Sequence, residues 1–334
     1  MNKIKEHIYV FGDTEYTPYL KKRYTIVGII DEKNPNKTIL GIPNIPLCNI
    51  DKNAYIINTV NNSRAFQAQK RLIDEGFSNT TFVGSLINKY PSEFKSTTLA
   101  QAQIAMKKDY SSLLKELESF ADNTSKEAFK NILNFRLTLN IKYLSSFEVK
   151  IDEQYFEDFL LDCSFKTLID GGAYDGADSK RFIKLFPTYE QIFVLEPSDK
   201  NGLLVKNNLK AYPNIHIIKA CLGEKNGHIR FEGTGTAAKI VQVGGTKVEQ
   251  RTIDSFNSKH RTLVKLDIEG AEMSALNGAT SALLNAEYSF AISAYHLPHD
   301  LLDILMKLKS SSQNRKLYFR HYSGGFAESV LFAI

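Results

Sequence analysis

The sequence predicts an α/β protein made of two units with mostly parallel sheets, and a helical segment between them. Short apolar runs rich in β-branched residues recur without polar alternation, which is typical of strands buried on both faces of a sheet. Segments with apolar residues at helical spacing alternate with these runs. The length of 334 residues agrees with two domains of roughly 150 residues each.

The first unit covers residues 1–88. Its helix is expected from Ser63 to Glu75, where Gly76 provides a C-terminal stop. The alternation of strand and helix on this scale predicts a small Rossmann-like α/β domain. The runs that predict its strands are His7–Phe11, Thr25–Ile30, Tyr55–Asn58 and Thr81–Val83.

Residues 89–159 are expected to form a helical connector that packs on the domain after it. Asp122–Ser125 supplies side chains that cap helix N-termini, in the middle of this segment. Apolar side chains repeat at helical spacing on both sides of it. They are Leu113, Leu114, Leu117 and Phe120, then Ala128, Phe129, Ile132, Leu133 and Phe135.

Residues 160–334 are expected to form the larger domain, in which strands and helices alternate. Only Ser323–Phe326 separates the last two strands, so these two must be antiparallel. The segment His228–Thr252 predicts a hairpin insertion, punctuated by Gly233, Gly235, Gly244 and Gly245. The predicted strands are Thr167–Asp170, Ile192–Glu196, Ile215–Ala220, Leu263–Ile268, Tyr288–Tyr295, Lys316–His321 and Ser329–Ile334. The predicted helices are Ser179–Leu185, Lys200–Leu209, Ala271–Leu284 and Leu301–Leu308.

Composition and charge argue against several classes of protein. The net charge of +5 is spread along the chain rather than clustered on one face, which argues against a nucleic-acid partner. No apolar run reaches the roughly 18 residues of a membrane-spanning helix, and the N-terminus has no signal-peptide pattern. Cys48, Cys163 and Cys221 form no disulfide or zinc pattern. We therefore expect a cytoplasmic protein with reduced thiols and no membrane insertion, and leave a homo-oligomer open.

A loop of small residues follows the first strand of the larger domain. Leu168–Gly176 passes from a strand into GGAYDG and then into a helix, and its glycines allow a ligand to approach the backbone closely. Glu196, about 20 residues further on at the tip of the next strand, can accept hydrogen bonds from both hydroxyls of a ribose. The alternative for Glu196 is a helix-start carboxylate, because Pro197-Ser198 follows it.

The charge of this loop favours a cationic ligand. A dinucleotide needs three glycines in GxGxxG so that its pyrophosphate can lie on the helix N-terminus. Here Tyr174 crowds the loop and the carboxylate of Asp175 would repel a pyrophosphate. S-adenosylmethionine (SAM) carries a sulfonium and an ammonium group and no phosphate, so the loop predicts SAM rather than NAD.

A second polar segment, VKLDIEGAE, ends the fourth strand of this domain at residues 264–272. Asp267 and Glu269 are two residues apart, so they would share one face of an extended chain. The pair can orient the SAM amino group, accept an acceptor proton or hold a divalent ion. The alternative is that Glu269 and Glu272 are first-turn carboxylates that stabilise a helix dipole. We expect that role for Glu272 and a site role for Asp267.

His296 follows the fifth strand, in SAYH, and is expected on the same rim as Asp267. An imidazole with an ordinary pKa near 6.5 can take a hydroxyl proton at neutral pH. The alternative for His296 is a structural role at a strand end. His299 and Asp300 follow Pro298 and are expected to start a helix.

Taken together, these motifs resemble the FkbM family of SAM-dependent methyltransferases, over roughly residues 120–334. The resemblance implies a class I methyltransferase sheet whose last strand lies antiparallel between the fifth and sixth. It also implies SAM at the first two strand tips and O-methylation of a hydroxyl, while the acceptor is not fixed. The motifs are IDGGAYDG, VLEPS, TIDSF with VKLDIEGAE, SAYH and the closing RHYSGGFAESVLFAI. YFEDFL, at residues 155–160, fits family versions that modify bacterial surface polysaccharides and flagellar sugars.

The expected site follows from the motifs and the resemblance. The acceptor is expected to be a sugar of a bacterial surface glycan or its nucleotide-linked precursor. No metal ligands are assigned, and assistance by a divalent metal is left open. The residues expected to bind SAM are Asp170, Gly171, Gly172, Ala173, Tyr174, Gly176, Glu196, Cys221 and Asp267. The catalytic candidates are Asp267, Glu269 and His296, and the choice of base between the last two is open.

Two alternatives come from other classes of protein. One is a non-catalytic scaffold with the same fold in a glycan assembly complex. The other is a nicotinamide-dependent sugar oxidoreductase that works through the first unit. Asp13 and Glu15 place negative charge after the first strand, where a phosphate would lie, so a structural or acceptor-presenting role is favoured there.

Overall fold

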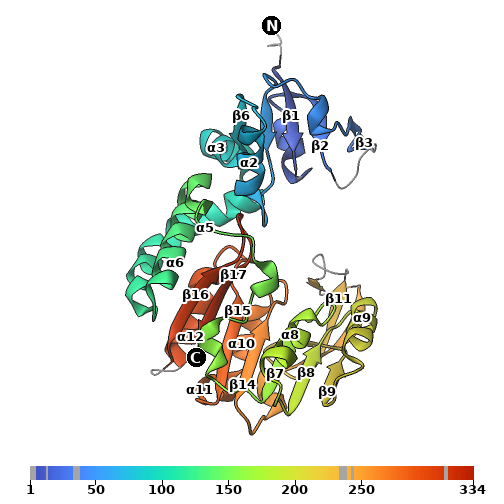
Figure 1. The fold of residues 1–334 in the computed structure, drawn as a ribbon, viewed down its shortest axis with the longest axis vertical. Helices are drawn as coiled ribbons and strands as arrows, with labels where there is room; N and C mark the ends of the chain where they lie inside the picture. Colours follow the sequence, from blue (N-terminus) through green and yellow to red (C-terminus); the bar gives the residue numbers. More distant parts are fainter. Residues whose placement is uncertain (1–4, 13, 33–37, 233–238, 242–243, 312–314) are drawn as a thin grey trace. The chain divides into compact units, whose positions relative to one another are not determined.

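The computed structural model describes the chain except for residues 1–4, 13, 33–37, 233–238, 242–243 and 312–314 (Figure 1). Asp13, Gly233 and Gly235, which entered the predictions above, lie outside the described residues. The described part of the chain divides into two compact units. The first unit contains Met1–Lys115, Glu127–Ile151 and His321–Glu328. The second unit contains Glu116–Lys126, Asp152–Arg320 and Ser329–Ile334.

The first unit is built on a parallel sheet. Among the described residues, four strands form this sheet in the order β2-β1-β5-β6. Leu72 of helix α2 (Ala65–Asp74) packs into its core with Phe11, Ile56 and Phe77, all buried. The strands are β1 (His7–Phe11), β2 (Thr25–Ile30), β5 (Ile56–Asn58) and β6 (Thr80–Phe82). The small Rossmann-like α/β unit predicted from the sequence is therefore confirmed.

Short elements complete the first unit. The shorter helices are α1 (Thr17–Leu20), α3 (Val83–Lys89) and α4 (Pro91–Phe94). A small antiparallel pair, β3 (Thr38–Ile39) with β4 (Ile42–Pro43), follows β2. The loop after β1 packs tightly on the segment after β5, because a Cβ at Gly12 would lie 2.3 Å from Val60 Cγ2. That contact gives Gly12 a packing role.

The loop between the last two strands of the chain also belongs to the first unit. Its backbone pairs with the segment after β5: the Phe66 N–H donates to the Gly324 oxygen at 2.8 Å and the Phe326 N–H to the Asn61 oxygen at 2.7 Å. A Cβ at Gly325 would lie 1.5 Å from the Asn62 oxygen. Protein backbone therefore covers the carboxyl end of β5, where a Rossmann-like domain usually receives a ligand.

Two long helices lie in the predicted connector, α5 (Thr98–Lys115) and α6 (Asn123–Thr138). Asp122 caps α6, since its Oδ1 accepts the Ser125 N–H at 2.7 Å. Residues 89–159 fall partly in each compact unit. The boundaries after residues 88 and 159 therefore stay predictions. Among the helices of the described residues, none combines the length and apolarity needed to cross a membrane.

The second unit contains the larger sheet. Within the described residues seven strands form it, in the order β16-β17-β15-β14-β7-β8-β9. The pairs from β15 to β9 are parallel, and β17 runs antiparallel to β15. The strands are β7 (Thr167–Gly171), β8 (Gln191–Leu195), β9 (Ile215–Ile218), β14 (Thr262–Leu266), β15 (Tyr288–Ser293), β16 (Leu317–His321) and β17 (Ser329–Ala333). The predicted position of the last strand, between the fifth and sixth, is confirmed.

The helix predicted over Ala271–Leu284 is two helices, which corrects the sequence prediction. Helix α10 (Glu272–Asn277) ends at Gly278, and α11 (Thr280–Leu284) begins two residues later. A Cβ at Gly278 would lie 2.1 Å from the Gly223 oxygen, so a contact with a distant loop sets the break. The other helices of this unit are α7 (Asp158–Leu161), α8 (Ala177–Leu185), α9 (Asp199–Leu209) and α12 (Asp300–Ser311).

The predicted hairpin insertion is part of a second small sheet. Its described strands are β10 (Ala220–Leu222), β11 (Gly227–Glu232), β12 (Lys239–Val241) and β13 (Thr246–Arg251). Strand β11 pairs antiparallel with both β12 and β13, and β13 pairs parallel with β10. The insertion is thus three antiparallel strands with β11 in the middle, and β13 joins them to β10.

Candidate functional site

The larger sheet has a switch point between β7 and β14. Strands β8 and β9 follow β7 on one side of it, and β14 and β15 lie on the other side. In open α/β sheets, ligands bind at such a point, outside the carboxyl ends of the strands. The loops after β7, β8, β14 and β15 meet this edge, and they contain most of the predicted site residues.

The glycine loop after β7 requires its glycines for geometric reasons. Gly172 has φ +76°, and a Cβ there would lie 1.8 Å from the backbone carbonyl oxygen of Asp267. Gly176 has φ +83° and is the N-cap residue of α8. Between them, Ala173 is buried, while Tyr174 is 59% exposed and has φ +52°, which is rare for a bulky residue. The loop after β7 therefore packs directly on the loop after β14 and presents Tyr174 outward.

Glu196 connects the glycine loop to the start of α9. Its Oε2 accepts the Tyr174 N–H at 3.0 Å, and its Oε1 accepts the Ser198 N–H at 2.9 Å. Burial raises the pKa of Glu196, although these backbone hydrogen bonds oppose the rise. Glu196 therefore lies beside the glycine loop and also contacts the helix start, and its hydrogen bonds to a ribose stay a prediction.

Cys221 lies in β10, near Glu196. Burial, with a smaller contribution from the Glu196 carboxylate, raises the pKa of the Cys221 thiol to about 12. The thiol is therefore neutral at physiological pH and lacks the thiolate character of a nucleophile. Its predicted place at the edge of a cofactor pocket stays a prediction.

A buried ion-pair group lies beneath the glycine loop. Lys265, in β14, directs its ammonium to Asp170 Oδ1 and Asp178 Oδ2, both at 3.1 Å, and to the Gly172 oxygen at 3.0 Å. Asp170 is fully buried and also accepts the Ser179 hydroxyl at 2.6 Å. Burial would lower the pKa of Lys265, but the surrounding carboxylates outweigh it and raise the pKa. Asp170 therefore supports the glycine loop through Lys265, whose ammonium contacts both this carboxylate and the Gly172 carbonyl oxygen.

Asp267 is held by a tyrosine from far upstream in the sequence. The Tyr155 hydroxyl donates to Asp267 Oδ2 at 2.9 Å and lies 2.8 Å from Ser293 Oγ. Tyr155 is buried and has φ +70°. Backbone strain of this kind persists only where surrounding contacts hold it, and it is concentrated at functional sites.

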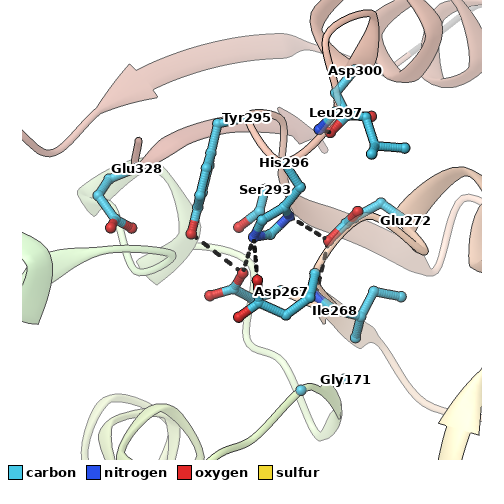
Figure 2. A network of polar contacts seen from close by, with 12 residues as sticks. Gly171, Asp267, Ile268, Glu272, Ser293, Tyr295, His296, Leu297, Asp300 and Glu328 are labelled. Carbon is cyan, nitrogen blue, oxygen red and sulfur yellow. Dashed lines mark hydrogen bonds and ion pairs between the residues drawn. The ribbon is translucent and has the colours of Figure 1, made fainter. Parts of the chain in front are cut away.

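His296 is surrounded by carboxylates from the loop after β14 and from α10 (Figure 2). Its Nδ1 is 2.9 Å from Glu272 Oε1, and its Nε2 is 3.3 Å from Asp267 Oδ1 and 3.5 Å from Glu269 Oε2. Burial would lower the pKa of His296, but the hydrogen bond to Glu272 and the three negative charges raise it to about 9. These protein groups therefore hold the ring in its cationic form at neutral pH.

The loop after β14 brings its acids together by a turn. The prediction that Asp267 and Glu269 share an extended face is wrong, because β14 ends at Leu266 and Glu269 has φ +56°. Both carboxylates still reach His296 Nε2. Glu272 starts α10 as expected, but it is fully buried and contacts His296, so helix-dipole stabilisation does not describe it completely.

Three site residues were missed by the sequence interpretation. Lys265 is in the quoted motif VKLDIEGAE, and a lysine within a strand expected to be buried on both faces was the available signal. Tyr155 begins the motif YFEDFL, but nothing in the sequence linked it to Asp267. Asp178, in the first turn of α8, resembles an ordinary helix-start acid.

Two other features of the described residues have ligand-binding potential. Asp267, Glu272 and His296 each offer a metal-ligating atom, and these atoms lie within 4.8 Å of one another. The first unit has a hollow of about 310 Å³ beside β2, lined by Asp31, Asn44 and Arg71 among others. In that hollow the guanidinium of Arg71 is already paired with Glu32 and Glu75. The site chemistry is therefore concentrated at the switch point of the larger sheet.

The sheet order and the switch-point site define a class I methyltransferase fold. Residues 170–317 match the family model of the methyltransferase FkbM domain. This part of the chain is therefore similar to the FkbM methyltransferase domain, in agreement with the resemblance of its motifs. The crystal structure of methyltransferase FkbM from Methylobacillus flagellatus KT superimposes with a TM-score of 0.78 at 20% identity. It covers 98% of this chain and 90% of its own, so the shared fold includes the first unit.

Two curated proteins are similar in sequence to part of this chain. The 2-O-methyltransferase NoeI of Sinorhizobium fredii is 23% identical over 157 residues, covering 39% of this chain and 64% of its own length. The hexuronic acid methyltransferase AglP of Haloferax volcanii is 28% identical over 142 residues, covering 39% of this chain and 59% of its own. The chain thus spans less than two thirds of the length of these relatives.

Proposed function

We propose that the methyltransferase domain uses SAM to methylate a hydroxyl group of a sugar acceptor. The observation that supports this most is the arrangement at one switch point. Three features meet there. They are a glycine loop with left-handed backbone conformation, an acid at the tip of the neighbouring strand, and a histidine among carboxylates. A binding function alone would not need the histidine among carboxylates.

The residues on the cofactor side fit SAM. Each Glu196 oxygen accepts one backbone N–H, and a carboxylate oxygen has a second lone pair with which to accept a ribose hydroxyl. Asp267 and Glu269 add negative charge next to the loop, which favours a ligand carrying a sulfonium and an ammonium group. The packing of Gly12 on Val60 in the first unit argues against the alternative of a nicotinamide site there.

The acceptor class is supported by the names of the relatives. NoeI is named for methylation at an oxygen and AglP for methylation of a hexuronic acid. Taken together, an oxygen in the first name and a sugar acid in the second support an oxygen of a sugar as the acceptor. The particular sugar, and its place in a surface glycan or a nucleotide-linked precursor, belong to this proposal.

The chain itself must position the acceptor and remove its proton. SAM supplies a methyl group on an activated carbon, so positioning and exclusion of water contribute most of the rate enhancement. Asp267, fixed by Tyr155, orients the acceptor hydroxyl. His296 takes the hydroxyl proton on Nε2, the nitrogen that faces Asp267 and Glu269, once a cationic ligand beside these two carboxylates has lowered the raised pKa of the ring. We favour His296 over Glu269 as the base because its side chain is 9% exposed and Glu269 is 34% exposed.

The cofactor assignment is tested by calorimetry with SAM on Glu196→Gln. Hydrogen bonds to charged groups contribute about 1.5–3 kcal/mol, so we expect SAM affinity to fall by roughly 10- to 100-fold. Glu190→Gln is the matched control, because Glu190 precedes the same strand at its other end and is half exposed. SAM affinity there should stay within twofold of wild type, and NAD should bind neither protein. Equal SAM affinity in all three proteins would contradict the assignment.

The reaction is tested by mass spectrometry with free and nucleotide-linked sugars. The expected product is an acceptor heavier by one methylene group, formed together with S-adenosylhomocysteine. SAM binding without product from any sugar would instead support the scaffold alternative.

A further inference from the structure

Tyr174 has a backbone conformation that is unfavourable for a side chain of its size. It lies between Gly172 and Gly176 in the loop after β7 and has φ +52°. In this left-handed conformation the Cβ of an ordinary residue crowds the following carbonyl oxygen, which glycine avoids and asparagine tolerates. The turn itself therefore favours glycine or asparagine over tyrosine at position 174.

Contacts within the fold do not explain the tyrosine either. Tyr174 is 59% exposed, and among the described residues its ring and hydroxyl make no hydrogen bond, ion pair or ring contact. Its hydrogen bond to Glu196 Oε2, at 3.0 Å, comes from the backbone N–H, which an asparagine or a glycine also has. The strain at Tyr174 is therefore present without a packing contact of the ring that offsets it.

The position of Tyr174 indicates what its ring contacts. Glu196, the acid to which we assign the ribose hydroxyls, accepts the N–H of Tyr174, so this side chain leaves the backbone next to the ribose. The face of an aromatic ring is apolar and packs well against a flat group. Backbone strain that the fold does not need is concentrated at sites of function.

We propose that the ring of Tyr174 packs against the adenosyl group of bound SAM, and that the left-handed strain is retained for this contact. The inference rests on the proposed methyl transfer from SAM. It makes Tyr174 a residue whose ring strengthens the cofactor complex and whose backbone weakens the free protein. The two effects have opposite signs, so one substitution can separate them.

Tyr174→Asn is that substitution, because asparagine tolerates the left-handed conformation and has no ring. In the absence of SAM, relief of the strain should raise the melting temperature by about 2–4 °C. By calorimetry, SAM affinity should fall roughly 3- to 10-fold, the size expected for the loss of one aromatic contact. S-adenosylhomocysteine has the same adenosyl group and no sulfonium charge, so its affinity should fall by the same factor.

Two controls separate the ring from the backbone. Tyr174→Phe keeps the ring and should bind SAM within about twofold of wild type. Leu40 is the matched position, because it has the same φ of +52° and the same exposure of 59% but lies between β3 and β4 in the first unit. Leu40→Asn should also raise the melting temperature, and it should leave SAM affinity unchanged.

Three results would overturn the role of the ring. The first is equal SAM affinity in wild type and Tyr174→Asn. The second is a lower melting temperature of the SAM-free variant, which would mean that the ring supports the fold instead. The third is a loss of affinity for SAM alone, which would place the ring at the sulfonium. A wild-type protein that does not bind SAM would contradict the proposed function as a whole, whereas these three results leave that function standing.

Discussion

Replacement of Lys265 by methionine tests how the glycine loop is supported. The side chain of Lys265 is 2% exposed, and its ammonium has four partners, Asp170, Asp178 and the carbonyl oxygens of Gly171 and Gly172. Methionine has a similar length and no charge, so Lys265→Met leaves Asp170 with no opposite charge within ion-pair distance among its described contacts. Breaking a buried ion pair by removing one partner costs about 3–5 kcal/mol. We expect Lys265→Met to lower the free energy of unfolding of the second unit by that amount.

The control for this change is an exposed ion pair in the same unit. Lys219 pairs with Asp199 at 2.6 Å, but the two side chains are 51% and 78% exposed. Exposed pairs contribute about 0–1 kcal/mol, so Lys219→Met should leave stability nearly unchanged. The double variant Lys265→Met/Asp170→Asn should recover at least about 1 kcal/mol of the loss, because it removes one of the stranded charges.

The chain contains no Trp, so unfolding cannot be followed by Trp fluorescence and the assay must measure the secondary structure itself. Urea unfolding followed by circular dichroism gives the stability of each variant, and hydrogen exchange of peptides from β7 and β14 locates the loss. A loss below about 1 kcal/mol in Lys265→Met would refute the reasoning. It would mean that water replaces the ammonium at little cost and that the loop is supported in another way.

Two further predictions concern other buried polar groups. Tyr155→Phe removes one hydrogen bond to Asp267 and should lower the free energy of unfolding by about 1–3 kcal/mol. It should also lower the rate of methyl transfer more than it lowers SAM affinity. Calorimetry and a rate assay check this, and an equal effect on the rate and on SAM affinity would contradict it. Burial, with the charge of Arg136, lowers the pKa of His321 to about 3 in the folded protein, so the ring is neutral there. The unfolded ring binds a proton below about pH 6.5, so stability should fall as pH drops from 6.5 towards 3, by on the order of 5 kcal/mol. His321→Asn should flatten this part of a urea-denaturation series, and an unchanged slope would refute the assignment.

The sheets were predictable because their signal is local. Runs such as Thr25–Ile30 and Leu263–Ile268 are buried on both faces, so they appear as unbroken apolar segments. The antiparallel end of the larger sheet followed from the short loop Ser323–Phe326. The break between α10 and α11 was not predictable, because it depends on the distant contact of Gly278 with Gly223. Contacts of that kind do not change the spacing of apolar residues along the sequence, so the helical pattern does not reveal them.

The site was predictable only as far as strand tips could be located. The loops that carry Asp267 and His296 follow strands, and strand tips at a switch point converge whatever their sequence. The role of Glu272 was hidden, because a carboxylate in a first turn has the same pattern whether it faces solvent or a histidine. Tyr155 was hidden because it reaches Asp267 over 112 positions of sequence. Side-chain direction, which the sequence pattern does not encode, separates these cases.

The charges at the switch point suggest an order for the proposed reaction. His296 is held as a cation by Asp267, Glu269 and Glu272, and a cationic ring cannot accept a proton. A cationic ligand beside Asp267 and Glu269 screens two of these three charges and lowers the pKa of the ring. Glu272, on the other side of the ring, keeps its contact with Nδ1. Under the proposed function the base is therefore formed only when a positive ligand is next to it, so proton transfer from the acceptor depends on the presence of the methyl donor.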